Sequence, residues 1–127
     1  MQDKYLYEYA VIRVVPRVER EEFLNVGIIV YCSKQGFLEA KIQVNEKRFK
    51  AFPCTVEIEE LKAYLGTWNR ICKGGKEGGA IGKLPIASRF RWLTATRSTI
   101  IQTSKVHPGF CESASETLEC LFRELVD

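Results

Sequence analysis

Residues 5–15 (YLYEYAVIRVV) and residues 26–32 (VGIIVYC) are two long apolar runs, and the charged connector 16–25 (PRVEREEFLN) joins them. In an extended strand, the side chains of the first run would be largely apolar on both faces, which predicts a central strand. The second run is rich in β-branched residues and predicts a second strand. Because the connector is too long for a tight hairpin, we expect a charged, solvated loop between these strands.

A third strand is predicted after the turn at residues 33–36 (SKQG). From Leu38 to Val44 the side chains alternate between apolar and polar, which indicates burial on one face only. A strand of this kind fits an antiparallel meander. Further along the chain, residues 98–103 (STIIQT) predict a fourth strand.

Two main helices are predicted to cover this sheet. Residues 56–72 carry acidic residues in the first turn, followed by one apolar stripe at spacings of three and four. Ser113 and Glu116 form a capping box, which predicts a second helix over residues 114–126. We therefore expect residues 1–127 to form a single α+β domain, in which an antiparallel sheet of four or more strands is packed by these two helices.

Five glycines fall within residues 74–85, which predicts a flexible loop at about residues 73–85. This segment does not fit a phosphate-binding loop. A Walker A loop has a glycine five positions before its Gly-Lys pair and Ser or Thr after the pair, whereas Glu77 and Leu84 occupy those positions here. The sequence therefore favours a surface loop over a nucleotide site.

The cysteines and the apolar runs indicate where the protein works. No Cys-x-x-Cys pair occurs among the five cysteines, so we expect free thiols rather than a disulfide framework or a zinc site, and we expect no cofactor. No apolar run approaches the roughly 20 residues that cross a bilayer, and the first residues do not form an export signal. We therefore expect a cytoplasmic protein without membrane contacts.

His107 is the single histidine of the chain and hence the one imidazole available for acid–base chemistry. Cys111 follows four positions later around a Pro-Gly turn, which is no recognised arrangement of a nucleophile and its base. Glu19, Glu21 and Glu22 lie among arginines that neutralise them, so they make a poor set of metal ligands. The sequence favours a protein without catalytic activity, and His107 is a weak candidate site residue.

Positive charge is concentrated between Gly78 and Cys111, where no acidic residue occurs. The basic residues of this segment are Lys83, Arg89, Arg91, Arg97 and Lys105. The segment thus carries +5, whereas the remaining 14 basic and 16 acidic residues give −2. One interpretation is an anion-binding or nucleic-acid-binding surface, and the other is an ordinary solvated face.

Basic and aromatic residues alternate in residues 89–92 (RFRW), as they do on some nucleic-acid-binding surfaces. In an extended strand the arginines would face one way and the aromatic side chains the other. We therefore expect the aromatic side chains to enter the core, which leaves phosphate contacts through the arginines without stacking on bases.

Several strings carry a resemblance to a known family: YAVIRVVP at residues 9–16, RFRWLTA at 89–95, RSTIIQ at 97–102 and VHPG at 106–109. Together with the pattern R-x-E-F-x-N-V-G at residues 20–27, they resemble a bacterial family known only as domain of unknown function 3037. The resemblance covers nearly the whole chain. It implies no established activity, but it implies a small stand-alone partner protein associated with HipA-like kinases, a toxin-related class.

The resemblance draws attention to polar residues inside or beside apolar strands, where burial requires partners. They are Arg13, Glu22, Asn25, Arg97, Ser98 and Thr99. One interpretation pairs Arg13 with Glu22 and lets Asn25 and Ser98 satisfy backbone groups. The other makes Arg13, Arg97, Ser98 and Thr99 a convergent anion or peptide site, with Arg97 as its main ligand because a guanidinium suits phosphate or carboxylate.

The leading hypothesis is a non-enzymatic module that binds another protein, with a HipA-like kinase as the candidate partner, through a sheet edge or the basic segment. The main alternative is a nucleic-acid-associated protein that uses the basic segment at residues 83–105. A second alternative is an enzyme whose site has no recognised motif and would require polar groups to converge around Arg13 and Arg97.

Overall fold

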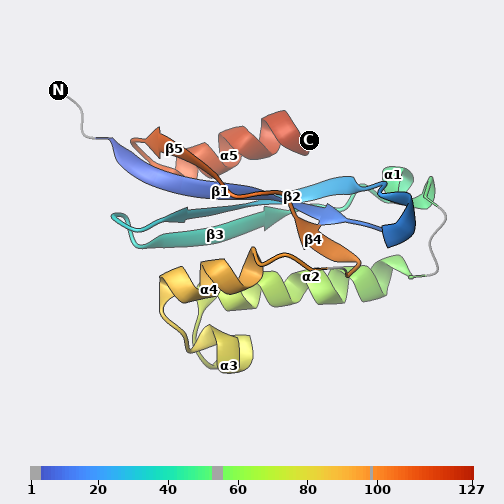
Figure 1. Cartoon of the computed structure of the whole chain (residues 1–127), viewed down its shortest axis with the longest axis horizontal. Helices are drawn as coiled ribbons and strands as arrows, with labels where there is room; N and C mark the ends of the chain where they lie inside the picture. Colours follow the sequence, from blue (N-terminus) through green and yellow to red (C-terminus); the bar gives the residue numbers. More distant parts are fainter. Residues whose placement is uncertain (1–3, 53–55, 98) are drawn as a thin grey trace.

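The N-terminal strand forms the middle of a five-stranded antiparallel sheet. β1 (Tyr5–Val14) pairs with β2 (Leu24–Cys32), and β2 pairs with β3 (Phe37–Ile42). On its other side β1 pairs with β4 (Ile101–Thr103) and with β5 (His107–Cys111). Strands from opposite ends of the chain therefore lie side by side, as the blue β1 and the orange β5 do in Figure 1.

The computed structural model describes residues 4–52, 56–97 and 99–127. Besides the strands, it contains the helices α1 (Glu46–Lys50), α2 (Ile58–Lys73), α3 (Gly79–Gly82), α4 (Ile86–Leu93) and α5 (Ala114–Leu125), with 3-10 turns at Val18–Arg20 and Lys76–Gly78. No helix in these ranges is long and apolar enough to span a membrane.

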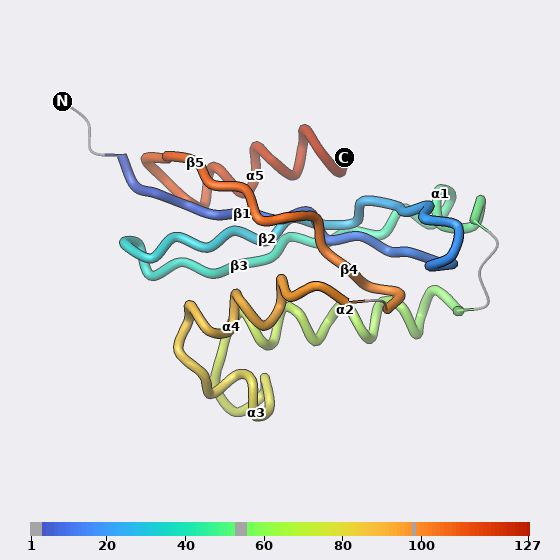
Figure 2. Tube along the Cα trace, in the orientation of Figure 1, coloured from blue at the N-terminus to red at the C-terminus, as the bar shows by residue number. Residues whose placement is uncertain are grey.

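Helices cover both faces of the sheet. α2 and α4 lie against one face and α5 lies against the other, as the trace in Figure 2 shows. Side chains of β1 alternate between these two layers: Ala10, Ile12 and Val14 pack with α2 and α4, whereas Val11 packs with α5. The predicted α+β domain with a central first strand is therefore confirmed.

Ser104 joins the two strands on the outer side of β1. Its backbone N–H donates to the Val11 carbonyl (2.9 Å), and its side-chain Oγ accepts from the Val11 N–H (2.8 Å). The pairing register to β1 then changes by one residue, from Ile12 opposite Thr103 to Tyr9 opposite His107. A buried hydroxyl thus replaces a backbone partner where the ladder is interrupted.

The two main helices agree with the sequence prediction to within two residues. The Ser113 Oγ accepts the N–H of Glu116, as expected for the N-terminus of α5. Residues 89–92 belong to α4 and not to an extended strand, and the expectation that both aromatic side chains enter the core is wrong for Trp92, which is exposed, whereas Phe90 is buried. Ile86, Phe90 and Leu93 stand four and three positions apart, so they form one apolar face that packs into the core.

Two further elements differ from the sequence prediction. β4 covers residues 101–103 only, and β5 was not expected because its Pro108 and Gly109 are poor strand formers. The glycine-rich segment contains helical turns, closed by a hydrogen bond from the Gly75 N–H to the Gly82 carbonyl (2.8 Å). The flexibility of this segment stays a prediction.

Gly27 allows β2 to approach β3 closely, which makes it a test of the sheet. A Cβ atom at this position would lie 2.7 Å from the Lys41 carbonyl oxygen and 2.9 Å from the Ile42 side chain. Because backbone cannot yield as a flexible side chain does, we expect Gly27→Ala to lower the free energy of unfolding by about 1–3 kcal/mol. Urea denaturation measures this change.

Gly66→Ala is the matched control for Gly27→Ala. Gly66 lies inside α2, and a Cβ atom there would meet only the Arg70 Nη1 at 3.4 Å. Alanine has the higher helix propensity, so this substitution should raise the free energy of unfolding by up to about 1 kcal/mol. An unchanged midpoint for Gly27→Ala would contradict the close approach of β2 and β3.

Candidate functional site

Arg13 lies in the middle of the sheet, on the face covered by α5. Its strand neighbours are Asn25 on β2 and Gln102 on β4, so three polar side chains form a row across the sheet. The Arg13 guanidinium lies 4.1 Å from the centre of the Phe23 ring. Its Nε atom is buried and has no hydrogen-bond partner in the part of the chain that the structure describes.

Asn25 connects β2 to the end of α5. Its Nδ2 donates to the carbonyl oxygen of Leu125 (3.1 Å), while its Oδ1 is buried without a partner among the described residues. Arg48 of α1 donates to the next carbonyl, that of Val126 (3.3 Å). Two polar side chains thus occupy the carbonyl end of α5, where helix carbonyls need donors.

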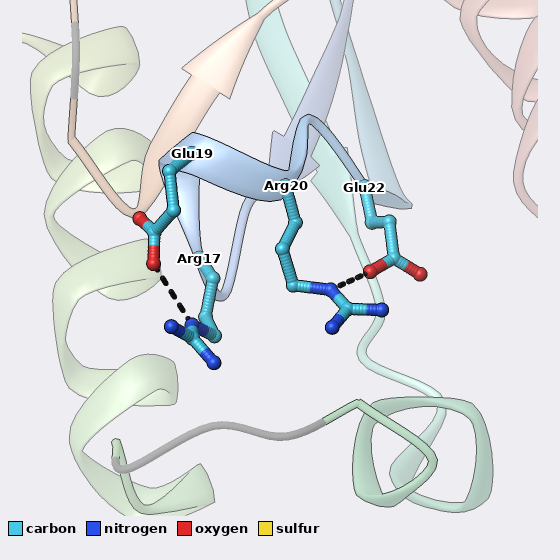
Figure 3. A network of polar contacts seen from close by, with 4 residues as sticks. All are labelled: Arg17, Glu19, Arg20 and Glu22. Carbon is cyan, nitrogen blue, oxygen red and sulfur yellow. Dashed lines mark hydrogen bonds and ion pairs between the residues drawn. The ribbon is translucent and has the colours of Figure 1, made fainter.

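Glu22 pairs with Arg20 and not with Arg13. Figure 3 shows this ion pair beside a second one, between Arg17 and Glu19 (2.9 Å). The 3-10 turn at Val18–Arg20 brings each pair together within the connector. Because all four side chains are exposed and solvent screens their charges, these pairs contribute little to stability. The expected pair between Arg13 and Glu22 is therefore absent.

Arg97 is not brought to Arg13. It lies 4.4 Å from the centre of the Trp92 ring and donates a hydrogen bond to the Trp92 carbonyl, at the end of α4. Burial lowers the pKa of the Arg97 guanidinium. The hydroxyl of Thr99 donates to the Ile101 carbonyl (2.7 Å), and Ser98 lies outside the described residues. Arg97 thus lies beside the end of α4, whereas Arg13 faces α5 on the opposite side of the sheet.

Three of the five basic-segment residues have partners inside the molecule. Arg89 donates to the carbonyls of Ile71 (2.9 Å), Cys72 (2.7 Å) and Leu84 (3.1 Å).

Arg91 forms a two-point ion pair with Glu8, at 2.7 and 2.8 Å, and the hydrogen bond to Glu8 raises its pKa. Arg97 contacts Trp92, as described above. Lys83 and Lys105 are exposed and make no ion pair within residues 4–52, 56–97 and 99–127. The segment therefore presents less free positive charge than its composition suggests.

His107 and Cys111 do not combine into a nucleophile and its base. The His107 ring lies on β5, 5.3 Å from the Tyr9 ring between centres. Cys111 is buried, and this burial raises the pKa of its thiol. A thiol of this kind is a weak nucleophile at neutral pH. Among the described residues, no group of three His, Cys, Asp or Glu side chains is arranged to hold a metal ion.

A groove follows the outer edge of β3, between this strand and α2. It consists of two hollows with volumes of about 490 and 340 Å³, which adjoin at Asn69 of α2. Leu38, Ala40, Lys73 and Arg89 are among the residues that line the first hollow. The second hollow is lined by Ile42, Val44, Leu65 and Gly66, together with Gln43 and Lys62. Together, the two hollows form a groove along the whole length of β3.

The backbone along this groove has unpaired groups. The Gln43 N–H donates to the Val26 carbonyl (2.7 Å), and bonded pairs alternate along an antiparallel ladder. Glu39 and Lys41 therefore face β2 with their backbone groups, whereas the N–H and C=O of Leu38, Ala40 and Ile42 point away from the sheet. In the described part of the chain, no strand pairs with this side of β3.

The opposite edge of the sheet is protected by a proline. Because Ser104 bonds to Val11, the odd-numbered residues of β1 face β4 and β5 with their backbone groups. Pro108, opposite Glu8, therefore points outward, where it offers no N–H to an incoming strand. Proline at such a position discourages edge-to-edge pairing. β3 carries no proline and is the more open edge.

Cys72 lies at the first hollow but does not supply a reactive group. Its side chain is buried, and desolvation raises the pKa of the thiol from 9.0 to about 12. The nearby Arg89 lowers this pKa by a smaller amount, and Glu39 raises it. The thiol therefore stays neutral at physiological pH and acts as a small apolar side chain.

A family model described as a protein of unknown function, DUF3037, matches residues 9–126 of the chain. The chain belongs to this family. The match confirms the resemblance seen in the sequence, and the part of the DUF3037 protein that it covers includes β2, β3, α2 and α4, which build the groove. No curated protein and no solved structure matches the chain.

The raised pKa of Cys72 predicts an alkaline loss of stability. As the pH rises from 9.0 toward 12, this thiol ionises in the unfolded chain but stays protonated in the folded protein. The unfolded state then binds fewer protons, so the free energy of unfolding falls with pH. We expect Cys72→Ala to make this fall shallower by up to about 1.4 kcal/mol per pH unit, as measured by urea denaturation.

Cys120→Ala is the control for this measurement, because it removes a thiol from an exposed position on α5. Its alkaline slope should match that of the wild type. If Cys72→Ala and the wild type gave parallel curves, the thiol of Cys72 would not be buried as described.

Proposed function

We propose that this DUF3037 protein is a non-enzymatic interaction module that binds an extended segment of another protein along the outer edge of β3. The observation that carries this proposal is the open edge of β3 beside the groove. An added strand would hydrogen-bond to the outward backbone groups of Leu38, Ala40 and Ile42. Its side chains on the α2 side would fill the groove, and these contacts would supply specificity.

The charge of the groove favours an acidic segment as the ligand. Lys73 and Arg89 line the first hollow together with Glu39, so cations outnumber carboxylates there. Arg89 donates to backbone carbonyls and pairs with no carboxylate among the described residues. Complementary charge increases the rate and the selectivity of association.

The contacts of the basic segment favour this proposal over nucleic-acid binding. Electrostatic binding to phosphates requires basic side chains that are free to exchange counterions. Arg91 and Arg97 instead hold Glu8 and Trp92. For the protein partner, the family resemblance implies a HipA-like kinase, which is the first candidate to test.

Blocking the edge with proline tests the proposal. The Ala40 N–H points outward, so Ala40→Pro removes a docking group without loss of a bond to β2. We would select binders from a displayed library of random peptides of about ten residues, the upper length of a typical strand. Their affinity for Ala40→Pro should fall at least about tenfold, equivalent to about 1.4 kcal/mol, as measured by fluorescence anisotropy.

Phe110→Pro is the matched control, since it places a proline at an outward position of the opposite edge. The selected peptides should bind this variant as tightly as the wild type. Peptides that bind the wild type and Ala40→Pro equally, or a selection that enriches no binder, would contradict docking at β3.

A further inference from the structure

The strand geometry of β3 determines which side chains of a bound segment reach the groove. Leu38, Ala40 and Ile42 direct their side chains toward the α2 layer, and the two hollows lie on this side of the edge. Side chains of an added strand alternate between the two faces. Every second residue of the segment therefore faces the groove, and its anchors are separated by an even number of residues.

The distance between the hollows selects one of these even separations. Residues 36–40 line the first hollow, with Leu38 at their midpoint, and Ile42 is the β3 residue that lines the second. Leu38 and Ile42 are about 14 Å apart in a strand that rises about 3.4 Å per residue. Anchors two residues apart span only about 7 Å, whereas anchors four residues apart span about 14 Å.

The first hollow is suited to a carboxylate. Arg89 uses its Nε and Nη1 atoms for backbone carbonyls, while its Nη2 donates to no group in the described part of the chain. Lys73, the last residue of α2, is exposed beside it. A guanidinium that is already fixed by carbonyls loses little freedom when it binds a carboxylate, which favours an acidic anchor.

The second hollow is suited to an apolar side chain. Ile42, Val44 and Leu65 line it, and Gly66 leaves room because it has no side chain. The Lys62 ammonium is directed to Glu46, at 3.0 Å, so its charge is already paired. An aliphatic side chain would bury apolar surface here without leaving a charge unpaired.

We infer that the bound segment carries an acidic residue for the first hollow and an aliphatic residue four positions away for the second. This specificity rests on the proposed docking at β3. It predicts a sequence pattern in the partner, Asp or Glu and then Leu, Ile or Val at a separation of four, in one of the two chain directions.

The spacing is tested with synthetic peptides based on the tightest displayed binder. In these peptides the acidic and aliphatic anchors stand two, four or six positions apart, with the remaining residues unchanged. We expect the four-residue separation to bind at least about tenfold more tightly than the other two by fluorescence anisotropy. Equal affinities for the three separations, together with loss of binding in Ala40→Pro, would overturn the two-anchor inference and leave docking at β3 intact.

Two variants assign the anchors to their hollows. Lys73→Glu should weaken binding of the acidic peptide at least about tenfold and should strengthen binding of a peptide in which Lys replaces the acidic residue. Lys76→Glu is the control, because it reverses an exposed charge outside the groove and should change neither affinity. Gly66→Met should fill the second hollow, so that replacing the aliphatic anchor by Ala no longer reduces affinity.

Unchanged preferences in both variants would overturn the assignment of the anchors. Peptides that bind without any dependence on the β3 edge would instead overturn the proposed function. The spacing series and the edge variants therefore separate a failure of the specificity from a failure of the docking site.

Discussion

The pairing of β1 with strands on both of its sides is the constraint on which the rest of the structure depends. Its residues alternate between two helix layers, and its backbone groups alternate between β2 on one side and β4 and β5 on the other. Because both sets of groups are buried, a shift of one residue would expose apolar side chains and leave backbone N–H donors without partners. The register of the whole sheet follows from this strand.

The same alternation decides which backbone groups reach the two edges of the sheet. Because β2 pairs with both β1 and β3, the backbone N–H and C=O groups of Leu38, Ala40 and Ile42 point outward from the edge of β3. The hydrogen bond of Ser104 to Val11 and the pairing of β5 with β1 place Pro108 at an outward position. The β5 edge therefore lacks an N–H donor at this position, whereas the β3 edge keeps its donors. A fold with one protected edge and one open edge beside a groove is well suited to accept a single added strand.

Much of this fold was predictable from local patterns. The apolar period predicted β1 to β3, and the capping box at Ser113 and Glu116 predicted α5, because these signals arise within one turn or one strand. β5 escaped prediction because Pro108 disfavours strands in general and is accepted here by an outward position. The groove escaped as well, since its residues come from β3, α2 and α4, which are far apart in the sequence.

The sequence by itself determined the fold class, the central strand and the family, because apolar periodicity, capping and long family strings are properties of neighbouring residues. The tertiary structure decided the partners of two basic residues of the chain: Glu8 for Arg91, and the carbonyls of Ile71 and Cys72 for Arg89. It also decided that β3 lies at an open edge. Charged residues and strand edges contact neighbours that are far away in the sequence, so patterns among adjacent residues do not predict these contacts.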